Sequence, residues 1–430
     1  MEMKINQDAY ADSLQPSASN IFEPSLHELI HNVKKEYIST GFLASNPIEA
    51  LNLRQLKDLL SMLKRKSPTQ KKSVDEWMRR PELLEELLVK CRNNKYEFGC
   101  SEESKIITNG KERYIYSFRT QDKILQKLIA MILNVIFDDL FYCESFAYRP
   151  FKNIKNGMEL LVDQSSEDTY ALKLDINKCF ASIDTIKLLS ILKSKISNTS
   201  LLRLIQKSLN TYCMIDGKKV RLTGIAQGSI HGPVLCNIFL HYLLDEPMRK
   251  EFPKARLFRY ADDTFVTFKE ETYLNKINQW VELTLNQSNL FISPKTPNIS
   301  SDLSNEKTFL GFRITRDNDG VKVDINPNKI KLKLLELCLR ESPMDALNYL
   351  RNRFKSTPLS EVSLKSWKKL LESIPSFLHI KLTSKIGTTR VDSIIRGIEF
   401  ELTYLLREVS HHLLEQSING VTDINGNYWR

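Results

Sequence analysis

Two acidic positions at the ends of apolar segments constrain this chain more than any other feature of its sequence. Asp175 ends the β-prone run TYALKLD (169–175), and Asp262 and Asp263 stand at the predicted turn of LFRYADDTFVTF (257–268). An aspartate at a turn is ordinarily only a turn residue. If the two segments pair in the centre of one sheet, however, their carboxylates converge on one edge and need cations between them. The two segments therefore predict a sheet with an acidic edge.

Such an edge is a candidate site for two Mg²⁺ ions, with Mn²⁺ as a possible substitute, because hard carboxylate oxygens suit these cations. Two ions roughly 3.5–4 Å apart clamp the attacking and leaving oxygens of a phosphoryl displacement. The charge of the chain agrees with a phosphate-rich partner: 62 Lys and Arg stand against 52 Asp and Glu, a formal net charge of +10. Basic side chains neutralise phosphates and release counterions, so a nucleic acid is the favoured partner.

Cysteine and histidine usage argues against a disulfide framework and against a zinc site. The seven cysteines are widely spaced without a CxxC, which is typical of free thiols in a reducing compartment. His411 and His412 are adjacent, so we expect them to point in different directions on a helix. The first twenty residues are too polar for a signal peptide, and the longest apolar run, 128–137, is too short to span a bilayer. We expect a soluble, cytoplasmic protein.

The N-terminal part predicts helices after a disordered tail. We expect the tail to cover residues 1–22 and a helical extension to cover 23–94. One helix should begin at Ser25, which opens a capping box, and another at Asn46, which a proline follows. The basic stretch Lys64–Arg80 is interpreted as a linker or an RNA-facing surface, and a solvated loop is an equal alternative.

The rest of the chain mixes hairpins with helices, which predicts the α+β class. Three hairpins are expected, with turns at Asn109-Gly110, Asp216-Gly217 and Asp262-Asp263. A long helix is predicted over 121–141, and another starts after Gly232-Pro233. From about residue 325 onward the pattern is helical and basic.

The YADD tetrapeptide (260–263) resembles the YxDD box of reverse transcriptases, and an ordered set of further segments extends the resemblance. These segments are ESFAYRPFKN (144–153), LKLDINKCF (172–180), GIAQGSIHGPVLCNIFLHYLLD (224–245), LFISPKT (290–296) and FLGF (309–312). The resemblance implies a right-hand polymerase of fingers, palm and thumb, with an antiparallel palm sheet. Fingers and palm would occupy 95–325, and a helical, RNA-binding thumb would occupy 326–430.

The resemblance also implies roles for individual residues. The metal ligands would be Asp175, Ile176, Asp262 and Asp263, and the catalytic set would be the three aspartates with Lys295 beside the pyrophosphate leaving group. The nucleotide-binding residues would be Lys105, Arg113, Phe180, Gln227 and Gly228. The nucleic-acid-binding residues would be Arg149, Lys365, Lys368 and Lys369.

Some of these residues also have simpler interpretations. Phe180 would exclude the 2′-OH of a ribonucleotide, or it would be a core residue. Lys105 and Arg113 would clamp the triphosphate, or they would be exposed hairpin charges. Three aromatic side chains among the C-terminal basic residues would stack on unpaired bases or would belong to the thumb core. They are Tyr349, Phe354 and Trp367.

The pattern departs from that of group II intron enzymes, which it otherwise resembles. Ile225-Ala226 replaces Thr-Pro, and Ile230-His231-Gly232 replaces Ile-Ser; the chain also leaves no room after the thumb for an endonuclease module. Retron peptides, a VTG after FLGF or an NAxxH, are missing. The resemblance therefore implies a bacterial reverse transcriptase of the unknown-group or defence-associated (DRT) kind, with the single-protein type 2 group as one candidate.

Such enzymes imply a non-coding RNA from the same locus as template, dNTPs as substrates, a cDNA product and a role in antiphage defence. Two other functions stay open. One is an RNA-directed RNA polymerase, which shares the palm, and the other is an RNA-binding scaffold with a decayed active site. Phe180 and FLGF favour DNA synthesis over RNA synthesis, and the complete set of three aspartates and Lys295 argues against decay.

Overall fold

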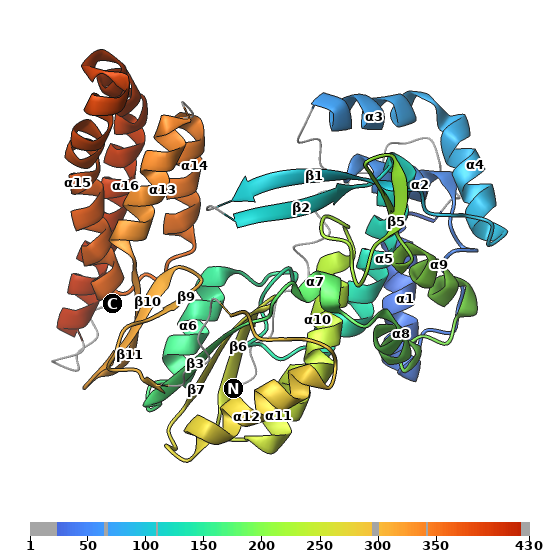
Figure 1. The fold of residues 1–430 in the computed structure, drawn as a ribbon, viewed down its shortest axis with the longest axis horizontal. Helices are drawn as coiled ribbons and strands as arrows, with labels where there is room; N and C mark the ends of the chain where they lie inside the picture. The colour runs from blue at the N-terminus through green and yellow to red at the C-terminus, as the bar shows by residue number, and fades with distance from the viewer. Residues whose placement is uncertain (1–23, 64–67, 109–110, 295–300, 341–342, 423–430) are drawn as a thin grey trace. The chain divides into compact units, whose positions relative to one another are not determined.

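The computed structural model describes residues 24–63, 68–108, 111–294, 301–340 and 343–422 (Figure 1). The chain divides into two compact units, each built from separated stretches. Unit 1 takes residues 1–136, 185–222 and 226–232, and unit 2 takes 137–184, 223–225 and 233–430. The expected tail, 1–22, lies outside the described residues. The helical extension thus shares a unit with the first hairpin, and the C-terminal helices share a unit with the acidic hairpin.

The N-terminal helices of unit 1 correct two expectations. They are α1 (Leu26–Thr40), α2 (Leu53–Ser61), α3 (Pro68–Arg79) and α4 (Pro81–Arg92). The capping box at Ser25 is confirmed. The helix start at Asn46 is wrong: the Asn46 carboxamide caps a short turn, and α2 begins only after Asn52, which makes its own capping box. The part of the basic stretch from residue 68 onward is helix α3, neither linker nor loop.

Unit 1 also contains a four-stranded sheet in the order β2-β1-β4-β5, and three further helices. Its elements are β1 (Ser101–Thr108), β2 (Lys111–Ser117), α5 (Thr120–Phe137), α8 (Thr185–Lys193), α9 (Thr199–Leu209), β4 (Tyr212–Ile215) and β5 (Lys218–Arg221). The two expected hairpins pair in antiparallel fashion. The turn residues of the first, Asn109 and Gly110, lie outside the described residues. Gly217 takes a φ of 75°, which explains the Asp-Gly turn.

The sheet of unit 2 confirms the pairing expected for the acidic segments. Its order is β6-β7-β3-β8, all antiparallel, with β6 (Arg256–Tyr260), β7 (Asp263–Phe268), β3 (Tyr170–Asp175) and β8 (Ser301–Asp302). The hairpin turn lies one residue earlier than expected. Tyr260 pairs with Asp263, so Ala261 and Asp262 form the two-residue turn and Asp263 is the first residue of its strand.

The helices of unit 2 lie before, between and after the strands of this sheet in the chain. Those before and after its strands are η2 (Asp138–Leu140), α6 (Ile154–Gln164), α7 (Cys179–Ser182), α10 (Gly232–Leu240), the π-helical η3 (His241–Asp245), α11 (Glu246–Glu251) and α12 (Tyr273–Asn286). A second sheet holds β9 (Lys307–Phe309), β10 (Phe312–Asp317) and β11 (Gly320–Ile325). It leads into α13 (Pro327–Leu339), α14 (Pro343–Lys355), α15 (Glu361–Ile386) and α16 (Thr388–Thr422).

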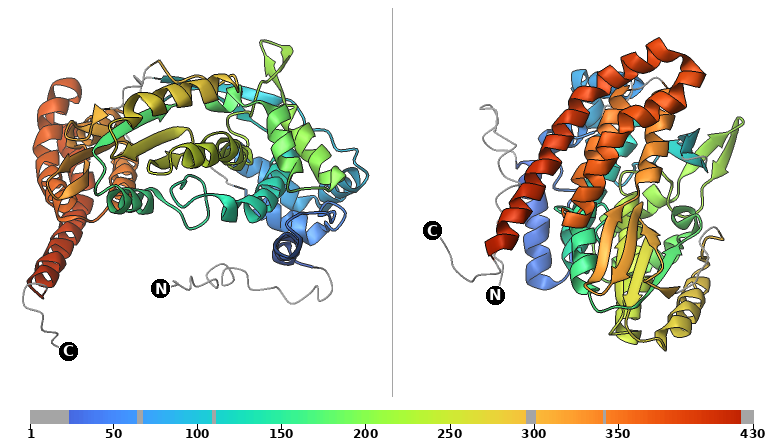
Figure 2. Two further views of the ribbon diagram at one scale, coloured as in Figure 1. Left: turned by 90° about the horizontal axis from the view of Figure 1, so that it is seen from below. Right: turned by 90° about the vertical axis from the view of Figure 1, so that its left-hand side faces the viewer.

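The C-terminal helices and the β6-β7-β3-β8 sheet share one hydrophobic core. Phe265 of β7 stacks on Phe309 of β9 at 5.3 Å between ring centroids, and Trp367 of α15 belongs to the same buried cluster. Helices α15 and α16 run side by side in both views of Figure 2. Across the described ranges, no helix combines the length and the apolar character needed to cross a membrane. The α+β class, the antiparallel sheet and the helical C-terminal region are confirmed.

Candidate active site

The acidic edge of the unit 2 sheet is set by strand register. Asp175 and Asp263 are direct partners across β3 and β7, so their side chains leave the same face. Asp262 occupies the adjoining turn, and all three aspartates are partly exposed. The sheet therefore places Asp175 and Asp263 side by side on one face, with Asp262 in the turn next to them.

The donor set fits divalent cations by its chemistry. Ile176 has a buried side chain without a polar atom, so only its backbone carbonyl could join the carboxylates. The antiparallel bridge between Ile176 and Ile292 is made by its neighbours: the Ser293 amide donates to the Asp175 carbonyl at 2.7 Å, and the Asn177 amide donates to the Phe291 carbonyl at 2.8 Å. This bridge leaves the Ile176 carbonyl unused. Oxygen donors of this kind are those that Mg²⁺ takes.

Lys173 is a site residue that the sequence reasoning missed. It lies two positions before Asp175, on the same face of β3, and its Nζ is 3.9 Å from Oδ1 of Asp263. A partly exposed cation at this distance offsets part of the repulsion between the carboxylates. The period-two alternation of KLD was the available signal, because it places Lys173 and Asp175 on one face.

The backbone of Phe180 is held in place by the neighbouring 224–225 segment. It lies in α7, five residues after Asp175, with a side chain that is half-buried and not part of the described core. Its carbonyl accepts a hydrogen bond from the Ile225 amide at 2.7 Å. Gly224, with a φ of 61°, lies so close that a Cβ there would be 2.3 Å from the Phe180 carbonyl oxygen. The interpretation of Phe180 as a core residue is therefore not supported.

Four expected nucleotide-binding residues lie in unit 1. Gln227 and Gly228 run beside β2, where the Gln227 carbonyl accepts from the Tyr116 amide at 2.8 Å and a Cβ on Gly228 would lie 2.6 Å from the Tyr116 carbonyl oxygen. Lys105 and Arg113 are exposed on the β1–β2 hairpin. Lys105 pairs with Glu112 at 2.7 Å, which a triphosphate would have to displace. Their role in binding a nucleotide stays a prediction.

The structure describes one of two further expected site residues, Arg149, and not the other. Lys295 lies outside the described residues. The geometry does not support a contact of Arg149 with a nucleic acid: its side chain is 6% exposed, and its guanidinium donates to the Asp138 carboxylate and to the carbonyls of Asp138, Tyr142 and Ser145. Four of its five N–H donors are thus used inside the unit, where they hold the 138–145 segment.

The C-terminal lysines and the aromatic residues near them lie in different environments. Lys365, Lys368 and Lys369 are exposed on α15, and Lys365 pairs with Glu361. The stacking of bases on Phe354 and Trp367 is corrected, because these rings are 5% and 0% exposed and pack edge-to-face on each other. The helical period was the available signal: Leu364, Trp367 and Leu371 recur at i, i+3 and i+7, which places them on one buried face.

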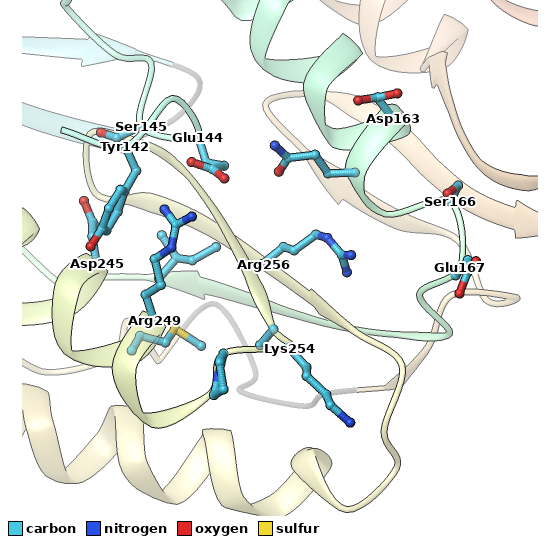
Figure 3. Close-up of a pocket in the computed structure, with 15 residues that line it drawn as sticks. Tyr142, Glu144, Ser145, Asp163, Ser166, Glu167, Asp245, Arg249, Lys254 and Arg256 are labelled. Carbon is cyan, nitrogen blue, oxygen red and sulfur yellow. The ribbon is translucent and has the colours of Figure 1, made fainter. Parts of the chain in front are cut away.

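A surface pocket of about 600 Å³ lies beside the edge strand β6 (Figure 3), and its lining includes none of Asp175, Asp262 and Asp263. Arg249 lies over the ring of Tyr142 at 4.2 Å in its wall. Other charges there already have partners: Arg256 pairs with Asp168, and Lys254 with Glu270. The pocket is therefore a mixed-charge surface feature and not the acidic edge.

Another group of metal-ligand type gathers on α16. One ligand atom each of His411, His412 and Glu415 lies within 4.8 Å of the others. The argument that adjacent histidines point apart is thus wrong for this helix, since Glu415 reaches both. Among the residues described, Asp175, Asp262 and Asp263 do not form so tight a group. Strand register and the chemistry of the donors therefore define the acidic edge.

Comparison with known proteins shows the family of the segment that contains this edge. Residues 101–314 match the family described as "Reverse transcriptase (RNA-dependent DNA polymerase)". The chain contains a reverse transcriptase domain. This domain covers β1 through β10, and with it both acidic strands and the segment around Gln227. The α+β architecture is accordingly that of a right-hand polymerase.

The reverse transcriptase domain has relatives among intron proteins. The chain is 31% identical over 147 residues to the "Uncharacterized 91 kDa protein in cob intron" of Schizosaccharomyces pombe, and 28% identical over 123 residues to the "Group II intron-encoded protein LtrA" of Lactococcus lactis subsp. cremoris. These matches cover 34% and 28% of this chain. They span only 18% and 20% of the relatives' own lengths.

Proposed function

We propose that the protein is an RNA-directed DNA polymerase that extends a primer by two-metal nucleotidyl transfer. The observation that carries the proposal is the register pair Asp175–Asp263, with Asp262 in the adjoining turn, inside a reverse transcriptase domain. Bound Mg²⁺ or Mn²⁺ would stabilise the charge that develops on the reacting phosphate oxygens. The residues that would hold these cations are Asp175, Asp262, Asp263 and, through its carbonyl, Ile176.

The chain's own residues have separate tasks in this proposal. Lys173 balances charge at the acidic edge, and Phe180 narrows the space beside the sugar of the incoming nucleotide. Gln227 and Gly228 line the pocket of the base, and the exposed Lys105 and Arg113 clamp the triphosphate. Lys295 assists the leaving pyrophosphate. Catalysis of phosphoryl transfer depends largely on positioning the reacting groups. The rigid placement of Asp175 and Asp263 by strand register therefore supports the proposed polymerase activity.

The biological setting belongs to the same proposal. The departures from intron enzymes at 225–226 and 230–232 support a bacterial enzyme of the defence-associated kind, acting in the cytoplasm. Its template would be a non-coding RNA from the same locus, its substrates dNTPs and its product a cDNA with antiphage function. The net charge of +10 supports a bound nucleic acid. Sequencing the RNA and DNA that co-purify with the protein identifies template and product.

The decisive test compares wild type with Asp262→Ala/Asp263→Ala for incorporation of labelled dNTPs and rNTPs on an RNA template. Removing these ligands should reduce DNA synthesis by about 10³-fold or more, the scale on which charge stabilisation acts in phosphoryl transfer. Folding should survive, because two mutually repelling carboxylates are removed.

A folded double variant with near-native DNA synthesis contradicts the proposal. Wild type that incorporates only rNTPs is instead an RNA polymerase, and wild type that incorporates neither nucleotide but binds RNA is a scaffold. Lys34→Ala/Lys35→Ala, on the exposed face of α1, is the control variant.

A further inference from the structure

Arg259 is a buried cation for which the acidic edge alone gives no reason. Its Nε and Nη2 donate to the two carboxylate oxygens of Asp245 at 2.8 and 2.6 Å. Its Nη1 donates to Oδ1 of Asn237 and to the carbonyl of Ala261, both at 3.0 Å. Arg259, Asp245 and Asn237 are 0–3% exposed. One guanidinium therefore links α10, the π-helical segment and the turn that presents Asp262.

The same residues are fixed from their other sides. The Asn237 side-chain amide donates to the Ala147 carbonyl at 2.8 Å. The Arg259 amide donates to the Glu144 carbonyl at 2.9 Å, and its own carbonyl accepts from the Phe146 amide at 3.1 Å. Asp245 also lies in the wall of the pocket of Figure 3. The guanidinium has little freedom to move, so the Ala261 carbonyl is held from a rigid base.

The turn itself needs such an anchor. Ala261 has a φ of 57°, a left-handed conformation that a residue with a Cβ adopts only when its surroundings impose it. Asp245 reaches Arg259 from a π-helical segment, and such segments are rare and concentrate at functional sites. A buried ion pair is in general no more stabilising than well-packed apolar residues, so stability alone does not explain this one.

We propose that Arg259 is a positioning residue: through the Ala261 carbonyl it fixes Asp262, and thereby sets the affinity of the acidic edge for a divalent cation. This inference rests on the proposed function of that edge. Asp245 and Asn237 orient the guanidinium and do not touch the reacting atoms. Lysine cannot replace the arginine, because one ammonium group cannot donate to both Asp245 oxygens and to the Ala261 carbonyl in a fixed plane.

The experiment measures Mn²⁺ binding to the full-length protein by electron paramagnetic resonance of the free ion. Wild type is compared with Arg259→Lys, and Asp262→Ala/Asp263→Ala defines binding elsewhere. Arg256→Lys is the matched control, since Arg256 lies on the same strand and pairs with the buried Asp168, but at the end remote from the turn. Circular dichroism and thermal unfolding report the fold of each variant.

Arg259→Lys should weaken Mn²⁺ binding by roughly 10- to 100-fold, as loss of a residue behind a metal ligand typically does, while Arg256→Lys stays close to wild type. A folded Arg259→Lys with wild-type affinity overturns the inference. If that variant does not fold, Asp245→Asn takes its place with the same expectation; if both unfold, the arginine is structural and the inference is overturned. If wild type binds no more Mn²⁺ than the double alanine variant, the proposed metal site fails instead.

Discussion

Single residues at the acidic edge differ in how far their neighbours constrain them. Asp175 and Asp263 are fixed by the pairing of two strands. Asp262 is fixed by a two-residue turn, in which the Ala261 carbonyl accepts a hydrogen bond from Arg259. Phe180 is constrained by the backbone, through the Ile225 amide and the close approach of Gly224. Substitutions of these side chains should therefore change the chemistry of the site more than its fold.

Phe180→Val tests the assignment of sugar selectivity. If the ring occupies the space of the 2′-OH, trimming it should reduce the preference for dNTPs over rNTPs by about 1–3 kcal/mol, or 10- to 200-fold, with DNA synthesis retained. Steady-state kcat/KM for matched dNTPs and rNTPs measures the change. Phe180→Tyr, which keeps the ring, is the control, and unchanged selectivity in a folded Phe180→Val excludes this role for Phe180.

His231 gives a prediction about pH. Burial lowers the pKa of His231 to about 3, and the imidazole Nε2 shares a hydrogen bond of 2.8 Å with Ser208 Oγ of α9. Since the folded-state pKa lies below the usual 6.5, protonation favours the unfolded chain. The stability that His231 contributes is complete above pH 6.5 and is lost as the pH falls from 6.5 toward 3.

His231→Gln should remove this dependence. Between pH 7 and 4.5 the free energy of unfolding of wild type should fall by ~2.5 kcal/mol more than that of the variant, from the pKa difference alone. Urea unfolding at the two pH values provides the comparison, and Ser208→Ala separates loss of the hydrogen bond from loss of the titrating group. Equal falls in wild type and His231→Gln would show that the imidazole is accessible to protons in the folded state.

At the scale of elements, α15 has a buried face and a basic face. Trp367, Leu364 and Leu371 are buried in the core of unit 2, while Lys365, Lys368 and Lys369 face solvent. Phe354 and Trp367 thus form core, and the three lysines are exposed to solvent, with Lys365 paired to Glu361. The same local logic explains α2, where Asn52 and not Asn46 begins the helix, because its side chain and that of Gln55 satisfy each other's backbone amides.

Reversing charge at Lys365, Lys368 and Lys369 should weaken retention of bound RNA. Each lost phosphate contact removes counterion release, so the slope of log K against log salt concentration should fall by roughly 2 to 3. Filter binding at salt concentrations from about 50 to about 300 mM measures this slope, because the affinity falls steeply over that range. The same reversal at Lys34, Lys35 and Lys57, exposed on α1 and α2, is the matched control. Wild-type affinity and slope in the α15 variant would exclude this face as an RNA-binding surface.

At the scale of the molecule, chain order and compact units do not coincide. The stretches 185–222 and 226–232 belong with the N-terminal helices, whereas 137–184 and 233–430 form the unit that holds the acidic edge. The chain therefore passes between units at the end of α5, at the start of α8 and three times between residues 222 and 233. The domains expected from the sequence were consecutive segments of the chain. The contacts that join segments distant in sequence cannot be deduced from the order of the residues.

The sequence by itself determined the features that depend on near neighbours. Period-two alternation and turn residues predicted the β3 strand, the acidic hairpin and the Asp216-Gly217 turn, because strand direction and positive φ are local properties. From these the convergence of Asp175 with Asp263 followed. Tertiary structure alone decided which polar groups are buried and paired. Arg149 was expected to face template but is used inside the unit, and Arg259 meets Asp245 only because a π-helical turn, fourteen residues away in sequence, lies against its strand.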